Sequence, residues 1–269
     1  SFYETYHVSI NGANDGEITV NIDAINTGTP PYQIDWVNDG VPQSGNTNPG
    51  ESSYVISNLY AGSYIITVTD ANSCEVILDE LVLLEPNTLI AHAEINQTYE
   101  GGMHITCNGE NDGEIRVWID ENNNGVPPYE IKWENGGVPN TYTTGEGETE
   151  YVITGLIAGS YTITVVDANS WEFSPAEIVL LQPDELLATI NVSSDYNGQD
   201  VSCNGLIDGS AIVNPSQGTS PYTYQWDVNA GNQLTQEATG LGAGTYNVTV
   251  SDANSCTVAK TISLTHPDP

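Results

Sequence analysis

The chain has 269 residues, of which 36 are acidic and only 3 are Lys or Arg, so its formal net charge at pH 7 is −33. This charge excludes nucleic acid as a partner, because phosphate binding needs clustered basic side chains. No apolar run approaches the roughly 20 residues that cross a bilayer, so we expect no direct membrane insertion. The chain nevertheless has 38% hydrophobic residues, 15 Tyr and 5 Trp, which argues against a disordered polyanion.

One sequence pattern occurs three times along the chain. Its most similar stretches are AGSYIITVTDANSCE (61–75), AGSYTITVVDANSWE (158–172) and AGTYNVTVSDANSCT (243–257). The repetition predicts tandem domains that each fold around their own core. Their ranges are 1–86, 87–183 and 184–269.

Within each copy, hydrophobic residues alternate with polar ones, as in SYIITVTD at 63–70, which places Tyr64, Ile66 and Val68 on one face. This period of two predicts β-strands. In the second copy we expect strands near 89–97, 103–107, 113–120, 128–134, 150–154, 160–166 and 171–181. About seven short strands with Gly, Pro, Asn and Asp between them are typical of an antiparallel sandwich. The predicted fold class is all-β, with three tandem Ig-like antiparallel β-sandwich repeats in a rod.

Aromatic residues recur at fixed places in the copies and predict a buried structural core. A sandwich buries a Trp, and a Tyr near a sheet corner bonds back to the backbone. The predicted core residues are Trp36, Trp133, Trp226, Tyr64, Tyr161 and Tyr246. The alternative for these rings is a platform on which a ligand stacks.

The first copy lacks a counterpart of LIAHAEINQT at 89–98, so its first strand is expected to be missing. One explanation is a window cut from a longer array. The other is a sandwich completed by a strand from an identical subunit through β-strand addition.

Taken together, several motifs resemble the SprB-type repeat of bacterial surface adhesins. They are CNG-x-x-DG at 203–209, PY-x-x-x-W, L-x-AG-x-Y and VTVSDANSC at 248–256. In outline the repeat is similar to the polycystic-kidney-disease-type Ig-like module. The resemblance covers nearly the whole chain and implies an extracellular, cell-surface repeat that acts as a stalk or an adhesive filament without catalysis.

The same resemblance implies one cysteine before NG and another after DANS in each repeat. The third copy alone has both, Cys203 and Cys256, and we expect these two to form a disulfide, which would stabilise by about 4 kcal/mol. Cys74 and Cys107 are then left unpaired, as buried thiols or as intermolecular cross-links. An oxidising compartment follows if the disulfide exists.

Two sets of oxygen ligands are candidates for Ca²⁺, which would be the only cofactor. Asn108, Glu110 and Asp112 alternate as at the start of an EF-hand loop, although Ile119 stands where the last ligand belongs. The alternative for this segment is an Asx-type turn before a strand. The other set lies near the joints between copies, where the alternative is a solvated acidic surface. Its members are Glu85, Glu94, Glu177 and Asp184.

Catalysis has little support, so we expect no enzyme activity. The histidines His7, His92, His104 and His266 share no neighbours, and there is no G-x-S-x-G or H-E-x-x-H motif. The expected partners are neighbouring repeats of the chain or identical subunits, and the expected function is structural and adhesive. Two alternatives stay open. One is binding of surface glycans or matrix through variable loops at 38–54 and 135–150, where Tyr142 lies, and the other is a fibre built by strand exchange.

Overall fold

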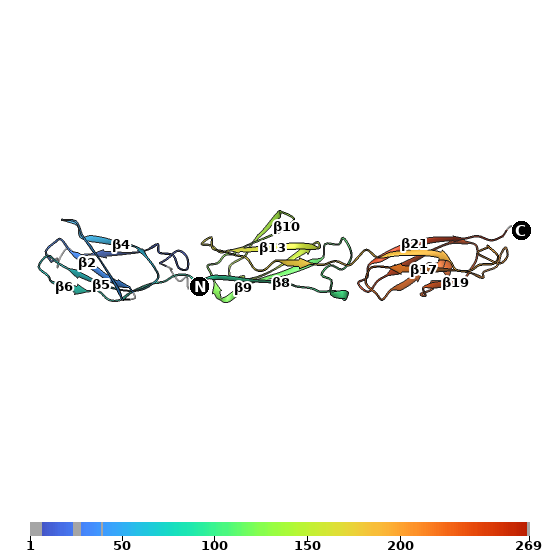
Figure 1. Ribbon diagram of the computed structural model, residues 1–269, viewed down its shortest axis with the longest axis horizontal. Helices are drawn as coiled ribbons and strands as arrows, with labels where there is room; N and C mark the ends of the chain where they lie inside the picture. Colours follow the sequence, from blue (N-terminus) through green and yellow to red (C-terminus); the bar gives the residue numbers. More distant parts are fainter. Residues whose placement is uncertain (1–6, 24–27, 39, 268–269) are drawn as a thin grey trace.

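The computed structural model describes residues 7–23, 28–38 and 40–267. It shows three β-sandwiches arranged end to end in a rod (Figure 1). The described residues contain no α-helix and two short 3₁₀ turns, η1 at Glu100–Gly102 and η2 at Val228–Ala230. The all-β antiparallel class expected from the sequence is therefore confirmed. The boundaries after residues 86 and 183 stay predictions.

The first sandwich contains strands β1 to β7. They are β1 (Gly16–Asn21), β2 (Gln33–Asn38), β3 (Val41–Asn46), β4 (Ser53–Leu59), β5 (Gly62–Thr69), β6 (Glu75–Ile77) and β7 (Leu81–Leu83). One sheet has the order β3-β2-β5-β6 with β7 also on β5, and the other pairs β1 with β4.

The second sandwich repeats this arrangement with one more strand. It contains β8 (Leu89–Ile95), β9 (Gly113–Asn124), β10 (Glu130–Asn135), β11 (Val138–Thr143), β12 (Glu150–Leu156), β13 (Gly159–Val166), β14 (Glu172–Phe173) and β15 (Ile178–Leu180). One sheet has the order β11-β10-β13-β14 with β15 also on β13, and the other is β12-β9-β8. In the described part of the first sandwich, no strand takes the place of β8 beside β1.

The third sandwich is shorter. It contains β16 (Leu187–Val192), β17 (Gly209–Ser216), β18 (Thr223–Trp226), β19 (Glu237–Leu241), β20 (Gly244–Ser251) and β21 (Thr257–Leu264). Its sheets have the orders β16-β17-β19 and β18-β20-β21. The turn η2 follows β18 where the other two sandwiches form a hairpin.

Each sandwich has its own hydrophobic cluster, with fully buried members such as Ile34, Ile131 and Val250. The burial alternates along the strands, as in β1, where every second residue is buried. This alternation is the physical consequence of a sheet with one face on the core. The three cores are not shared, so each sandwich excludes water from its own interior.

The structure corrects four of the expected elements. Residues 103–107 form no strand, although the His104 and Ile105 N–H groups both donate to the Leu181 carbonyl, at 2.8 and 3.1 Å. The expected strand at 171–181 is two short ones, β14 and β15. The predicted loop at 135–150 contains β11, and the one at 38–54 contains β3.

The segment 135–150 was expected to be a loop, but β11 within it forms a hairpin with β10. Asn135 pairs with Val138, so Gly136 and Gly137 form a two-residue turn, and their φ values are 61° and 81°. Two consecutive positive φ angles match the right-handed twist of paired strands. The strand that follows, VPNTYT, is almost entirely exposed and so lacks the buried alternation by which a strand is recognised in sequence.

Candidate functional site: the joints between sandwiches

The residues that precede each NG motif fasten the end of the sandwich to its last strand. His7 and His104 each accept a hydrogen bond at Nδ1 from the N–H of Leu84 and Leu181, at 3.0 and 2.9 Å. In the third sandwich Asp200 replaces the histidine and accepts from the Thr265 N–H at 2.8 Å. These two histidines thus have a structural role.

The Asp of each NG-x-x-DG motif also fixes this segment. Asp112 accepts from the Thr106 N–H at 3.1 Å and from its hydroxyl. Ser9 and Ser202 donate their N–H groups in the same way to Asp15 and Asp208, at 3.0 and 3.1 Å. Hydrogen bonds from the Ser9 and Ser202 side chains and backbones hold the pKa values of Asp15 and Asp208 below their usual range.

The Asp of each DANS turn shapes the opposite end of the sandwich. Asp252 accepts from the N–H groups of Thr219, Asn254 and Cys256, each at 2.9 Å. Asp70 and Asp167 make the same set of contacts in the other sandwiches. Backbone hydrogen bonds from Thr29 and then Cys74 lower the pKa of Asp70. This carboxylate therefore sets the backbone at the residue after DANS, where two of the copies have cysteine.

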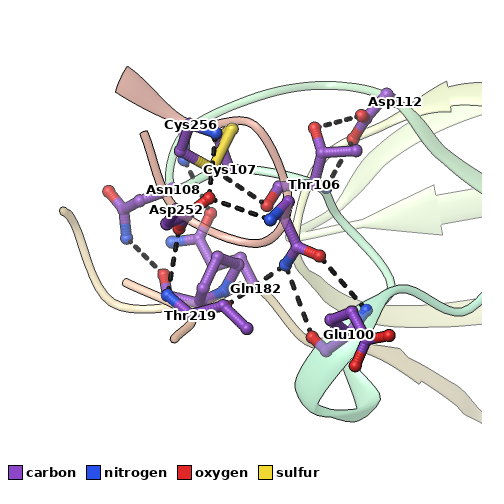
Figure 2. The surroundings of a disulfide bond; sticks show 12 residues. Glu100, Thr106, Cys107, Asn108, Asp112, Gln182, Thr219, Asp252 and Cys256 are labelled. Carbon is purple, nitrogen blue, oxygen red and sulfur yellow. Dashed lines mark hydrogen bonds between the residues drawn. A yellow bond between two sulfur atoms is a disulfide. The ribbon is translucent and has the colours of Figure 1, made fainter. Parts of the chain in front are cut away.

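A disulfide joins the second sandwich to the third. Cys107 and Cys256 are bonded with their Cα atoms 5.6 Å apart, at a sequence separation of 149. Figure 2 shows the bond beside Thr106 and Asp252, between the end segment of one sandwich and the DANS turn of the next. The carbonyl oxygen of Thr106 lies 3.2 Å from the Cys256 Sγ.

The expected disulfide between Cys203 and Cys256 is therefore wrong, and Cys107 is not an unpaired cysteine. Cys203 is a free, exposed thiol, and so is Cys74, which was expected to be buried or cross-linked. The physical reason is distance. Cys203 lies near Asp200, which bonds Thr265 just after β21, whereas Cys256 lies just before the start of β21. A strand of 8 residues separates the two by roughly 26 Å, and a disulfide needs Cα atoms within about 7 Å.

The pairing across joints also explains which cysteines are missing. At the joint between the first and second sandwiches, Ile10 and Trp171 stand at the positions of Cys107 and Cys256. There, the Asn169 side-chain amide donates to the Ser9 carbonyl. The two cysteines that are absent, one from the first copy and one from the second, therefore belong to the two halves of one joint. Both are replaced there, and both are kept at the next joint.

Further contacts close the joint between the second and third sandwiches. The Glu100 N–H donates to the Asn254 Oδ1 at 3.1 Å, and the Asn254 Nδ2 donates to the Thr219 Oγ1 at 3.2 Å. A groove of about 400 Å³ lies at this joint, with Met103, Pro183 and Thr219 among its lining residues.

The predicted calcium ligands have other roles or stand apart. Asn108 donates to the Pro183 carbonyl at 3.0 Å, and the Asp112 carboxylate accepts the hydrogen bonds from Thr106. Glu85 accepts from the Gly12 N–H at 2.6 Å. Glu94 pairs with Arg116, and the remaining members of the set, Glu110, Glu177 and Asp184, are exposed. Within residues 7–23, 28–38 and 40–267, no three His, Cys, Asp or Glu side chains form a group that could hold a metal ion.

The repeated tyrosines lie in the cores and bond back to the backbone. The Tyr64, Tyr161 and Tyr246 hydroxyls donate to the carbonyls of the residues four positions earlier, at 2.8, 2.9 and 2.9 Å. Each hydroxyl thus satisfies a carbonyl at the bend between two strands, which is the geometry of a tyrosine corner.

The repeated tryptophans differ in burial. Trp226 is fully buried, and its Nε1 donates to the Thr235 carbonyl at 2.9 Å. Trp36 is buried and Trp133 half-buried, and they pack against Tyr54 and Tyr151 with ring centroids 6.3 Å apart in both cases. The Trp226 ring has no face open to a ligand, which removes the stacking-platform alternative at that position.

Two further aromatic clusters lie in the second sandwich, one packed against the edge of its core and one on the outer face of β9. Tyr142, at the loop proposed for sugars, stacks on Tyr151 with centroids 3.8 Å apart and donates to Glu148, which raises the pKa of Tyr142. On the outer face of β9, Trp118 is stacked by His92 and covered by the Arg116 guanidinium, 4.9 Å from the ring centroid. In the sequence, Arg116 and Trp118 are two positions apart in one predicted strand, so they share its outer face, and this spacing could have predicted the cluster.

Comparison with known proteins identifies the repeat. The family model of the SprB repeat matches residues 104–138 and 196–231. No curated protein matches the chain. Among solved structures, a 1.5-MDa bacterial ice-binding adhesin is 14% identical, with 94% of this chain and 90% of that chain covered and a TM-score of 0.51.

A second similar structure is a Ca²⁺-stabilized adhesin of an Antarctic bacterium, 14% identical over 94% of this chain and 69% of that chain, with a TM-score of 0.46. None of the described residues forms a helix long and apolar enough to cross a membrane. Residues 104–138 and 196–231 thus match the SprB repeat, which indicates a cell-surface, extracellular protein, and the fold is that of Ig-like β-sandwiches.

Proposed function

We propose that this chain is a non-catalytic stalk of a cell-surface adhesin and that its joints keep consecutive sandwiches in line. The observation that carries the proposal is the Cys107–Cys256 disulfide. It gives the second and third sandwiches a second covalent connection besides the peptide linker. Two attachment points on one interface remove much of the hinge motion that a single linker allows.

The charge distribution supports the same function. The net charge of −33 is spread over the whole sequence, so neighbouring sandwiches repel one another and the chain resists folding back on itself. The ice-binding adhesin with a TM-score of 0.51 was solved to explain its retention at the host cell surface. A rod that projects a binding region away from a cell fits both observations.

The experiment is small-angle X-ray scattering on two double variants. Cys107→Ser/Cys256→Ser removes the joint disulfide, and Cys74→Ser/Cys203→Ser removes the same number of sulfurs without touching a joint. We expect a lower radius of gyration and a broader distance distribution for the joint variant, with the control variant unchanged. Equal scattering curves from both variants would show that the disulfide does not stiffen the joint.

Adhesion itself needs a separate test. Binding of surface glycans or matrix is the alternative, and a glycan array with the full chain examines it directly. Strong and selective binding would make this chain a recognition module, whereas a stalk binds none of the glycans selectively. Strand exchange predicts polymers that truncation at residue 98 or 260 abolishes, and light scattering of the truncated chains distinguishes it.

A further inference from the structure

The third sandwich has an open sheet edge where the other two have a paired strand. In the second sandwich β10 lies between β11 and β13, and in the first β2 lies between β3 and β5. In the third, β18 takes the place of β10 and pairs with β20 alone, and the described residues form no strand on its other side. The strands run along the rod (Figure 1), so this edge lies on the side of the rod.

The backbone of β18 directs hydrogen-bonding groups toward this edge. The Asp227 N–H faces β20 and donates to the Asn247 carbonyl at 2.9 Å. The Trp226 N–H, one residue earlier, faces the other way and donates to the Gln233 carbonyl at 3.0 Å. Since these directions alternate along a strand, the N–H and C=O of Tyr224 face the open edge as well. Among the described residues, nothing bonds to the Tyr224 backbone on that side.

Two residues at this edge are less buried than their counterparts in the second sandwich. Tyr129 and Ile131 are each 1% exposed. Ile131 is paired with β11, and the Tyr129 carbonyl accepts from the N–H of Thr144, just after that strand, at 2.9 Å. Tyr222 and Tyr224 have the same positions in the third sandwich and are half-buried, although both pack against its core. Their exposed surface is the surface that a neighbouring strand covers elsewhere.

A groove of about 530 Å³ lies along the open edge. One wall is β18, with Tyr222 and Tyr224, and the other contains residues 234–236, which lead into β19 of the other sheet. Leu234 is 68% exposed. Every residue that lines the groove is uncharged, in a chain whose net charge is −33. Strand addition uses these two features, because unpaired backbone groups give affinity and neighbouring side-chain pockets give specificity.

We propose that this edge binds an extended, acid-free segment of another protein, which adds to the sheet as an antiparallel strand beside β18. The strands at this position in the other sandwiches, β3 and β11, indicate what fits there. Their sequences are VPQSGN and VPNTYT, which contain no charged residue, and both pair antiparallel with their neighbours. An aromatic side chain beside Tyr224 would correspond to Tyr142, which is paired with Ile131.

The charge of the chain decides between another protein and a second copy. Two copies with a net charge of −33 each repel one another, and the strands β3 and β11 of each copy are already paired within it. A partner segment flanked by Lys or Arg is attracted instead. The rod thus carries a binding site on its side, in addition to its function as a stalk.

The test measures binding of a synthetic peptide to the full chain. The probe is the β11 sequence, residues 138–143, with a lysine at each end and a fluorescent label, and fluorescence anisotropy gives its affinity. We expect it to bind and to slow hydrogen–deuterium exchange in the segment that contains Tyr224. The same peptide with Asn140→Asp and Thr143→Glu should bind about tenfold more weakly, because its carboxylates are repelled by the chain.

Two variants with the same change of charge separate the groove from the rest of the surface. Leu234→Asp places a carboxylate in the groove, and Val228→Asp places one in η2, at a position that is 74% exposed and does not line the groove. We expect about tenfold weaker peptide binding for Leu234→Asp and no loss for Val228→Asp. No binding of the peptide, equal affinity of the two variants, or self-association of the chain that Leu234→Asp abolishes would each overturn the proposal. None of these results bears on the stalk function, because that rests on the Cys107–Cys256 joint.

Discussion

Cys256 is bonded to Cys107 of the preceding sandwich, and not to Cys203 of its own. The bond therefore fastens two domains together where a disulfide within one sandwich would have fastened a domain to itself. In this arrangement the cysteines of a repeat are matched with those of its neighbours. A substitution of one of these cysteines therefore alters the contact between two sandwiches, because its bonding partner lies in the adjacent repeat.

Reduction of the disulfide should destabilise the second and third sandwiches and leave the first unchanged. The bond closes a loop across most of both sandwiches, with a sequence separation of 149. The chain-entropy model gives up to about 5 kcal/mol for a loop of that length when both sandwiches unfold. Hydrogen–deuterium exchange of the Cys107→Ser/Cys256→Ser variant measures the effect peptide by peptide. Equal loss of protection in the first sandwich would contradict a local role of the bond.

A new disulfide should form at the first joint in the variant Ile10→Cys/Trp171→Cys. These positions correspond to Cys107 and Cys256, and the Asn169 contact with Ser9 brings the two segments together. We expect a titration with Ellman's reagent to find only the thiols of Cys74 and Cys203 after oxidation. Ile10→Cys/Val179→Cys is the control, since Val179 pairs with Ser160 near the far end of the second sandwich, and its added thiols should stay reactive.

Loss of the tyrosine-corner hydroxyl should lower the stability of one sandwich. Tyr161→Phe removes the bond to the Ile157 carbonyl and leaves that carbonyl without this donor. We expect the free energy of unfolding of the second sandwich to fall by about 1–2 kcal/mol. Hydrogen exchange of its core peptides at increasing urea concentration measures this loss. Tyr60→Phe changes an exposed ring of the first sandwich and should have almost no effect. A similar loss in both variants would show that the hydroxyl bond is not the cause.

The DANS turn of the first sandwich should be acid-sensitive. The Thr29 and Cys74 N–H groups lower the pKa of Asp70 below its ordinary 3.8. The carboxylate therefore adds stability at pH values above about 4, and this stability is lost as the pH falls through the folded-state pKa. Asp70→Asn should destabilise the first sandwich at pH 7, and the difference from the unsubstituted chain should shrink toward pH 3.

The comparison between variants is needed because acid also discharges the polyanion. Protonation of the 36 acidic residues relieves repulsion and stabilises the compact state, which opposes the effect of Asp70. Glu75→Gln is a suitable control, because Glu75 is an exposed acid at the start of β6. Glu75→Gln should change the stability at pH 7 less than Asp70→Asn does, and a pH-independent difference for Asp70→Asn would contradict the assigned contacts.

The sequence by itself determined the local structure of this protein. The alternation of residues such as Tyr64 and Ile66 specified strands with one buried face, and the repetition of L-x-x-G-x-Y specified where Tyr161 and Tyr246 would lie. Strand β11 was missed because both of its faces are largely exposed. Its formation depends on the Gly136–Gly137 turn and on pairing with β10.

Only the tertiary structure decided the pairing of the cysteines. Motif spacing brings Cys203 and Cys256 into one repeat, but β20 and β21 separate them by the full length of the sandwich. The stacking of sandwiches end to end then places Cys107 beside Cys256. A disulfide depends on a distance of a few ångströms between Cα atoms, and that distance is fixed by how the domains stack, which no pattern within one repeat contains.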